Sequence, residues 1–525
     1  MRHIKQIGFI LLVGILVAGL VGCGKQANQT KAAPQAKQEL VVGLAADANN
    51  LKFKEIGIGS PNANIYESLV KLNADYQVEP LLATKWEYKG NNAWRFYLRN
   101  GVKFHNGKEF TAEAVKQTLE QEIRPSGKSI LKIEEGSVKV VDKYTVDIVT
   151  TEPNMRVPEI LAHPLHGIRA PGSDSVKNPT GTGPFRFVGY EKDKELVVER
   201  NPDYWGTPSR LDKVVFKYIP DHNTRLMALQ AGEVDVIKEI PREMIGQSKA
   251  KGGVKLSTAP QGPYVALSLM VNGKHPHDVL RDKNVRQAIG WAIDREAIVQ
   301  KVWEGNADSS QTVIPAGILG EHKNLVKGFG YDAARAKTLL DEAGWRPGSD
   351  GIRTKDGRRL ELTLVSGFPS ASVLKPLPEV LQQQLRDVGI GIQIMEVADD
   401  GLYYDRLKKG EGDLWLERGN QNNGDPTFLP ELLFHSRGYQ GSTYDKPFWP
   451  GEKFDRLVDE ARSSPDIREA ARLMAEAMHV LIDEESTVVP IAALYNVYAA
   501  REKVEGLNPH PADINTRWDA VYIRE

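Results

Sequence analysis

The stretch that decides the fold is PLLATKWEYKGNNAWRFYLRNGVKFHNGKEFTAEAV, residues 80–115. Its segment WRFYL, residues 94–98, combines aromatic and apolar residues in a way that is typical of a β-strand. His105 follows in a strand-turn-strand pattern, where we expect a histidine that packs or forms hydrogen bonds rather than one that binds a ligand. The stretch therefore predicts strands joined by a turn in the first part of the chain.

Further strands are expected on both sides of this stretch. Residues 41–42 (VV) and residues 214–219 (VVFKYI) are rich in β-branched and aromatic side chains, which is typical of strands. Residues 138–149 (VKVVDKYTVDIV) predict a hairpin whose two strands are separated at Asp142 and Lys143.

Helices are expected between the strands. In YDAARAKTLLDEAGW, residues 331–345, Asp332 is a suitable N-cap and Gly344 supplies a C-terminal stop. A second helix is expected to open at Ser464 and Pro465 and to continue through REAARLMAEAMHVLIDEE. Alternation of strands and helices predicts an α/β protein of more than one domain.

Two short motifs predict turns. GTGPF, residues 181–185, places two glycines just before a proline, and glycine permits backbone angles that are closed to other residues. NPDYWG, residues 201–206, predicts another turn, whose Tyr204 and Trp205 are expected to seal the edge of a sheet.

The first residues indicate the compartment. Arg2 and Lys5 precede an almost wholly apolar run at residues 7–21, a pattern typical of a secretory signal and too short for a membrane-spanning helix. Residues 20–23, LVGC, resemble the bacterial lipobox, which implies cleavage before Cys23 and a lipid on its sulfur. The alternative is an ordinary signal peptide with an incidental cysteine.

The only cysteine of the 525 residues is Cys23, which excludes an intramolecular disulfide and any cysteine-based metal cluster. The polar sequence GKQANQTKAAPQAKQ that follows cannot bury a core, so residues 23–39 are expected to form a lipidated cysteine and a flexible tether. Charge is nearly balanced, with 68 Lys and Arg against 69 Asp and Glu, which gives no support for nucleic-acid binding.

Motifs along the chain carry a resemblance to a known family. After the stretch at 80–115 come, in order, GTGPF (181–185), NPDYWG (201–206), ALQAGEVDV (228–236), VRQAIGWAIDR (285–295) and YDAARAKTLLDEAGW (331–345). This series resembles the bacterial extracellular solute-binding proteins of ABC importers, a family that includes dipeptide-, oligopeptide- and nickel-binding proteins. The resemblance covers the chain from about Leu40 to the C-terminus.

The resemblance implies a two-lobed periplasmic-binding-protein fold of the large, three-subdomain α/β type, with a hinge and an interlobe ligand cleft. The expected divisions are a lipoprotein signal peptide at 1–22, the tether at 23–39, a first-lobe core at 40–65, 179–266 and 488–525, an extra subdomain at 66–178, and a second lobe at 267–487.

The candidate ligand loop is WLERGNQNNGDPTFL, residues 415–429. In dipeptide-binding relatives an aspartate in this loop pairs with the ammonium of the peptide, and Asn422 stands at the matching position here. A neutral amide cannot replace that carboxylate, so simple dipeptides become less expected as ligands. Arg418 offers a fork suited to a carboxylate, and with Asn422 and Asn423 it predicts an anion site. The alternatives are a solvated Arg418 at a strand end and a turn role for Asn423.

Other candidate ligand residues come from two places. LAHPLHGIRAP, residues 161–171, lies where nickel-binding relatives carry an arginine that binds the chelate, so His163, His166 and Arg169 are candidates. Tyr403, Tyr404 and Trp415 offer aromatic walls, although core packing explains each of them equally well.

These residues lead to a functional hypothesis. We expect a monomeric, lipid-anchored, extracytoplasmic binding protein that captures a nickel or cobalt chelate, or an opine-type metallophore, for an ABC permease and its ATPase; the metal is then ligand, not cofactor. The alternative is a di- or oligopeptide importer, and a peptide-sensing receptor or chaperone is a further possibility. No GxSxG, HExxH, phosphate-loop or dinucleotide motif appears in a supporting context, so we do not expect an enzyme.

Overall fold

The computed structural model describes residues 37–45, 64–123, 131–174, 177–238, 240, 245, 253–367, 374–397, 400–438 and 448–524. The signal sequence, Cys23 and nearly all of the tether lie outside the described residues, so the lipidation of Cys23 remains a prediction. None of the helices in the described ranges is long and apolar enough to cross a membrane.

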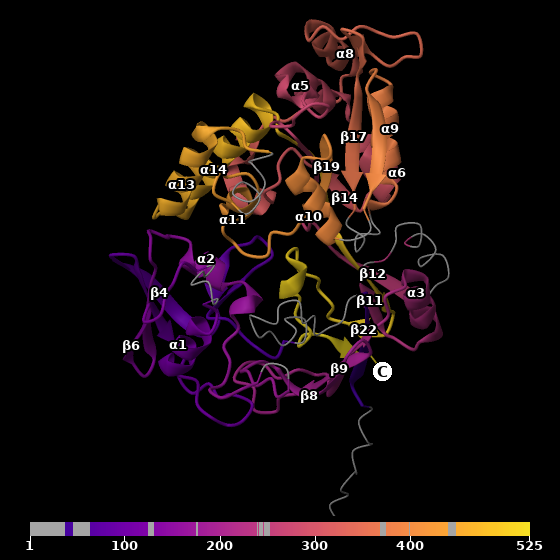
Figure 1. The fold of residues 1–525 in the computed structure, drawn as a ribbon. Coiled ribbons are helices and arrows are strands. Elements are labelled where there is room, and N and C mark those ends of the chain that lie inside the picture. The colour runs from indigo at the N-terminus through magenta and orange to yellow at the C-terminus, as the bar shows by residue number, and fades with distance from the viewer. Residues whose placement is uncertain are drawn as a thin grey trace, which may run out of the picture. The chain divides into compact units, whose positions relative to one another are not determined.

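A seven-stranded sheet contains both early and late parts of the chain (Figure 1). Its strands lie in the order β12 (Val254–Ala259), β21 (Asn496–Arg501), β11 (Val236–Lys238), β1 (Glu39–Leu44), β10 (Lys213–Tyr218), β9 (Glu195–Arg200) and β8 (Phe185–Glu191). Parallel pairing is limited to β1 with its neighbours β10 and β11, and the other pairs are antiparallel. The sequence-predicted strands at 41–42 and 214–219 are confirmed.

A four-stranded antiparallel sheet contains two strands from the stretch at residues 80–115. Its order is β4 (Ala83–Gly90), β5 (Ala93–Leu98), β7 (Thr145–Val149) and β6 (Val138–Asp142), and α1 (Ala112–Glu120) and α2 (Val157–Leu161) contribute to its core. On β5 the side chains of Trp94, Phe96 and Leu98 are buried in alternation. The predicted strand at 94–98 and the hairpin at 138–149 are both confirmed.

His105 has the packing role that its sequence pattern predicts. Its Nε2 lies 3.0 Å from the carbonyl oxygen of Gly183, and its Nδ1 accepts from the Gly181 N–H at 3.3 Å. Burial lowers the pKa of His105 to about 4, so the ring is neutral at physiological pH. The histidine thus ties the 80–115 stretch to the GTGPF motif.

The glycines of GTGPF are required for a different reason from the one expected. Neither Gly181 nor Gly183 has a positive φ. A Cβ on Gly181 would lie 2.1 Å from the carbonyl oxygen of Ile65, and one on Gly183 would lie 2.1 Å from that of Asn64. Close backbone packing, rather than backbone angle, therefore excludes side chains here.

The NPDYWG motif supplies hydrogen bonds to a buried acid instead of sealing a sheet edge. Tyr204 Oη and Trp205 Nε1 donate to the Glu67 carboxylate at 2.7 and 2.8 Å, and Thr182 Oγ1 donates to it at 3.0 Å. Burial raises the pKa of Glu67, and the nearby Arg517 opposes this shift. The motif therefore stabilises an internal polar cluster.

A six-stranded sheet is built from the middle of the chain, in the order β14 (Ala307–Ser309), β20 (Val488–Leu494), β13 (Tyr264–Leu269), β19 (Leu414–Gly419), β17 (Glu361–Ser366) and β18 (Gly391–Glu396). One face packs against α5 (Lys283–Ala292), α6 (Arg295–Trp303), α8 (Ala333–Glu342) and α9 (Leu377–Arg386). The other face packs against α10 (Asp400–Lys409), α11 (Phe428–Leu433), α13 (Glu452–Ser463) and α14 (Ile467–His479) (Figure 1).

Two of these helices test the predicted boundaries. Asp332 caps α8 by accepting from the Arg335 N–H, as expected. The second helix begins later than predicted, because Asp466, not Ser464, caps α14 and accepts the N–H of Arg468 in its first turn. Ser464 keeps an extended backbone, so it ends α13 rather than opening α14.

The chain crosses between the seven- and six-stranded sheets twice, at residues 260–263 and at Tyr495. Both β13 and β20 pair within the six-stranded sheet, so the crossings lie several residues outside the limits of 267 and 487 that the sequence suggested. The division into two lobes and an extra subdomain remains a prediction.

Candidate functional site

Strand β19 supplies side chains to two faces of the six-stranded sheet. In its antiparallel register with β13, Arg418 lies opposite Val265 and Glu417 lies opposite Ala266. Successive side chains of a strand point to opposite faces. Glu417 therefore shares a face with Tyr264 and Trp415, whereas Arg418 shares the other face with the buried Leu416.

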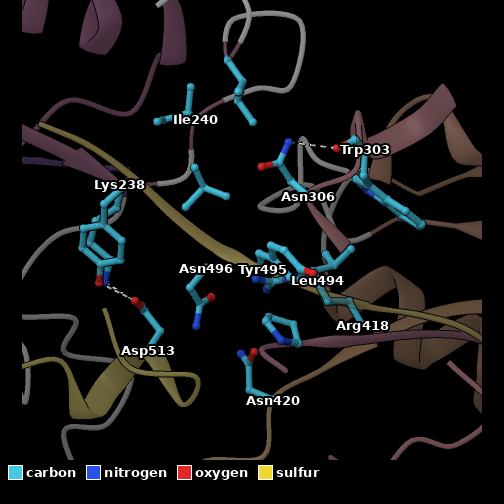
Figure 2. Close-up of a pocket in the computed structure, with 14 residues that line it drawn as sticks. Lys238, Ile240, Trp303, Asn306, Arg418, Asn420, Leu494, Tyr495, Asn496 and Asp513 are labelled. Carbon is cyan, nitrogen blue, oxygen red and sulfur yellow. Dashed lines mark hydrogen bonds and ion pairs between the residues drawn. The ribbon is translucent and has the colours of Figure 1, made fainter. Parts of the chain in front are cut away.

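The first pocket, which we call the hinge pocket, lies where the two sheets meet. It is lined by Lys238, Tyr498 and Asp513 from one side, by Arg418 and Asn420 from the other, and by the crossing residues 494–497 (Figure 2). Its volume is about 130 Å³. Figure 2 shows Arg418 and Asn420 facing Lys238 and Asp513 across this space.

Charge in the hinge pocket is organised around Asp513. Lys238 Nζ lies 2.5 Å from Asp513 Oδ2, and the Tyr498 hydroxyl donates to the other carboxylate oxygen. Burial and the charge of Asp513 raise the pKa of Tyr498, which keeps the hydroxyl protonated. With Arg418 included, the pocket carries two cationic side chains and one carboxylate.

The second pocket, which we call the tyrosine pocket, shares Arg418 and Asn420 with the first. Its volume is about 270 Å³, and its lining includes Tyr403, Tyr404 and Asn422. Three of the residues predicted from sequence, together with Arg418, are thus brought to one pocket.

A residue that the sequence analysis missed, Glu417, also lines the tyrosine pocket. Its side chain is nearly buried, with 4% of the residue surface exposed. After burial, the charge of Glu417 is the next largest cause that raises the pKa values of Tyr264 and Tyr403. The available signal was an acidic residue that ends the apolar run LWLE, where a strand would otherwise continue into the core.

The loop after β19 is held by its own side chains. Gln421 Nε2 donates to the carbonyl oxygens of Asn423 and Asp425 at 2.9 and 2.8 Å, and to Asn423 Oδ1 at 2.9 Å. Asn423 Oδ1 also accepts from the Asp425 N–H at 3.1 Å. Asn423 therefore has the hydrogen bonds of a turn residue, while the half-buried Asn422 lines the pocket.

Trp415 belongs to the core beneath the site. It is fully buried, and its ring lies edge-on to that of Tyr403 with a centroid distance of 5.0 Å. Tyr403 in turn contacts Tyr404 at 5.4 Å. Trp415 thus supports the pocket wall that Tyr403 and Tyr404 form.

His163, His166 and Arg169 lie beside the four-stranded sheet and are not among the residues that line either pocket. His166 Nδ1 lies 2.6 Å from a carboxylate oxygen of Glu122, and Arg169 Nη2 donates to the Thr118 carbonyl at 3.0 Å. Burial lowers the pKa of His163 to about 3. Their role as ligand residues remains a prediction from sequence.

Among the described residues, no group of three or more His, Cys, Asp or Glu side chains is placed to hold a metal ion.

Comparisons with known proteins agree on one family. Residues 77–441 match the model described as bacterial extracellular solute-binding proteins, family 5 Middle. The dipeptide-binding protein of Escherichia coli (strain K12) is 28% identical over 478 residues, which cover 84% of this chain and 86% of that protein. The glutathione-binding protein GsiB of Salmonella choleraesuis (strain SC-B67) is 29% identical over 468 residues, with the same two coverages of 84% and 86%.

A solved structure extends the match to the fold. NikA from Brucella suis, in complex with Fe(III)-EDTA, superposes with a TM-score of 0.79 at 25% identity and covers 93% of this chain and 100% of that one. The α/β fold of the periplasmic-binding-protein type that the motifs predicted is confirmed. The chain belongs to the bacterial extracellular solute-binding proteins, family 5.

Proposed function

We propose that this protein is the binding subunit of an ABC importer and that its ligand is a small, zwitterionic, peptide-like solute held across the hinge and tyrosine pockets. The observation that carries the proposal is the buried Glu417 beside Arg418 in the tyrosine pocket. The similarity to dipeptide- and glutathione-binding relatives supports the same ligand class.

Glu417 supplies the negative charge that a peptide ligand would lack at Asn422. A ligand ammonium taken out of water needs a counter-charge, which the amide of Asn422 cannot provide. The Glu417 carboxylate, at the wall of the same pocket, is suited to that role. The guanidinium of Arg418 presents a planar fork to a ligand carboxylate.

The two pockets also suggest how the ligand favours closure. Lys238 and Asp513 belong to the side of the seven-stranded sheet, whereas Arg418 and Asn420 follow the six-stranded sheet. A ligand shifts an equilibrium only through contacts that are better in one state than in the other. A solute that contacts both sides therefore stabilises the state in which the sides are close, which is the state that a permease would recognise.

A second candidate ligand is an anionic nickel or cobalt chelate, or an opine-type metallophore. Arg418 and Lys238 in the hinge pocket favour carboxylates, and the similarity to NikA points the same way. In either case we propose that a lipid on Cys23 anchors the protein to the outer face of the cell membrane.

Calorimetry with matched ligands separates the two candidates. We expect free di- and tripeptides or glutathione to bind, N-acetylated versions to bind at least about tenfold more weakly, and Glu417→Gln to remove this preference for the free amine. Glu361→Gln, at an exposed position on β17, is the control for the same charge change. Binding of nickel or cobalt histidine chelates without any binding of peptides would instead establish the second candidate.

A further inference from the structure

A third pocket lies next to the tyrosine pocket and shares Tyr264 with it. We call it the Gln421 pocket; its lining includes Gln421, Asp308, Ser309, Ser310 and Thr312, and its volume is about 100 Å³. Since one water needs only about 10–15 Å³ of such space, the pocket has room for the end of a long side chain.

The amide of Gln421 has an oxygen that lacks a partner. Its Nε2 is surrounded by three acceptor oxygens at 2.8 to 2.9 Å, which fixes the nitrogen on the loop side and the oxygen on the other side. Gln421 is only 3% exposed, and its Oε1 is buried with no hydrogen-bond partner among the residues that the structure describes. A buried acceptor left in this state is costly unless a donor reaches it.

The two serine hydroxyl groups at the pocket already donate elsewhere, so they are not that donor. Ser310 Oγ donates to the Thr312 carbonyl at 2.7 Å, and Ser309 Oγ donates to Glu296. Asp308 accepts from the Tyr495 hydroxyl at 2.8 Å, and a carboxylate has capacity for further donors. No lysine, arginine or histidine is among the lining residues.

The pocket therefore presents acceptors and negative charge, in contrast to the cationic side chains of the hinge pocket. We propose that the Gln421 pocket is a ligand subsite for a cationic, hydrogen-bond-donating side chain, that of a lysine or arginine residue in the peptide-like solute. Asp308, exposed at the pocket, attracts the cation, and Gln421 Oε1 accepts one of its N–H groups.

The position of Gln421 in the chain links this subsite to the main site. Its neighbours Asn420 and Asn422 both line the tyrosine pocket, and the buried Tyr264 contributes to both walls. A ligand residue next to the one held at Glu417 can thus direct its side chain toward Asp308. This inference rests on the proposed peptide-like ligand and adds a preference among such ligands.

Calorimetry with tripeptides tests the subsite. The probes are tri-alanine and its single substitutions, at each position in turn, by lysine or by norleucine, which has a similar shape without the charge. At one position we expect lysine to bind at least about tenfold more tightly than norleucine, since hydrogen bonds to charged groups are among the stronger ones. Asp308→Asn, which keeps an acceptor for Tyr495, should reduce that preference at least about threefold and leave tri-alanine binding unchanged.

Asp356→Asn is the control, because it removes the same charge at an exposed turn between two short paired strands. The φ of Asp356 is +51°, which asparagine also accepts. Gln421→Met removes the buried acceptor and should also reduce the lysine preference, with thermal unfolding used to verify the fold. Equal binding of lysine and norleucine at every position, or an Asp308→Asn variant that behaves like the control, would overturn the subsite alone. Failure of every peptide to bind would overturn the proposed function and the subsite together.

Discussion

At the scale of single residues, the site depends on two adjacent side chains of opposite charge. Glu417 and Arg418 follow one another on β19, and both line the tyrosine pocket, although the strand directs them to different faces. The alternation of a strand is visible in the sequence, but which face meets a pocket depends on pairing with β13, about 150 residues earlier. For this reason the pocket position of Glu417 could not be predicted from the sequence, and the role of Arg418 in binding remains a prediction.

The contribution of Arg418 can be measured directly. We expect Arg418→Ala to weaken binding of the native ligand by about 2 to 5 kcal/mol, because truncation would leave a desolvated ligand carboxylate unpaired. Arg418→Lys should fall between, since it keeps the charge and loses the fork. Arg346→Ala, which removes an arginine with a largely exposed side chain, is the control. Calorimetry that finds Arg418→Ala within about threefold of the wild type would exclude a role for Arg418 in binding.

At the scale of structural elements, the GTGPF motif packs closely against the backbone of Asn64 and Ile65. We expect Gly181→Ala to lower the free energy of unfolding by about 1 to 3 kcal/mol, the usual range for overpacking. The reason is that the added Cβ would lie 2.1 Å from the Ile65 carbonyl oxygen. Gly189→Ala is a matched control, because its Cβ would have no neighbour within 4 Å. Chemical unfolding of the two variants checks this; equal stabilities would show that the segment moves aside without cost.

Elements differ in how far the sequence predicts them. The α8 helix and the strand β5 were predictable because caps, stops and periodic burial are local. The start of α14 was misplaced by two residues, because Ser464, Pro465 and Asp466 all favour a helix start and only the hydrogen bonds select Asp466. The Gln421 pocket could not be predicted, since its lining comes from separate segments of the chain between Gln261 and Ala493.

At the scale of the whole described chain, residues 152–159, which follow the four-stranded sheet, contact the end of α13 and the 420–427 loop. Arg462, at the end of α13, donates to Glu152 at 2.6 Å, and Arg156 donates to the Ser464 carbonyl oxygen. The carboxyls of Glu159 and Asp425 are both buried at this contact. The contact therefore brings together charged groups that would regain water if the two sides separated.

This contact predicts a pH dependence of stability. Burial raises the pKa of Glu159 to about 7 and that of Asp425 to about 6, against the opposing charge of Arg156. The packed state thus holds protons more tightly than the unfolded chain, so this contribution is full below about pH 4 and is lost as the pH rises through 6 to 7. We expect unfolding free energies to fall over that range.

Glu159→Gln isolates the contribution of this carboxyl, because the amide stays neutral at every pH. Arg156, Asp425 and Glu431, whose charge also raises the pKa of Asp425, remain in place. Denaturant unfolding between about pH 5 and pH 8 should give a flatter profile for this variant than for the wild type. Parallel profiles would mean that Glu159 does not titrate in this range.

The strand order of the seven-stranded sheet has a consequence for synthesis. Strand β21, at Asn496–Arg501, lies between β11 and β12, and it is the only bridge between them in the described sheet. The ribosome must therefore reach residues 496–501 before this sheet can be completed. A nascent chain that stops before β21 leaves one edge of β11 and one edge of β12 unpaired, so translation order itself delays completion of the sheet until residues 496–501 have been made.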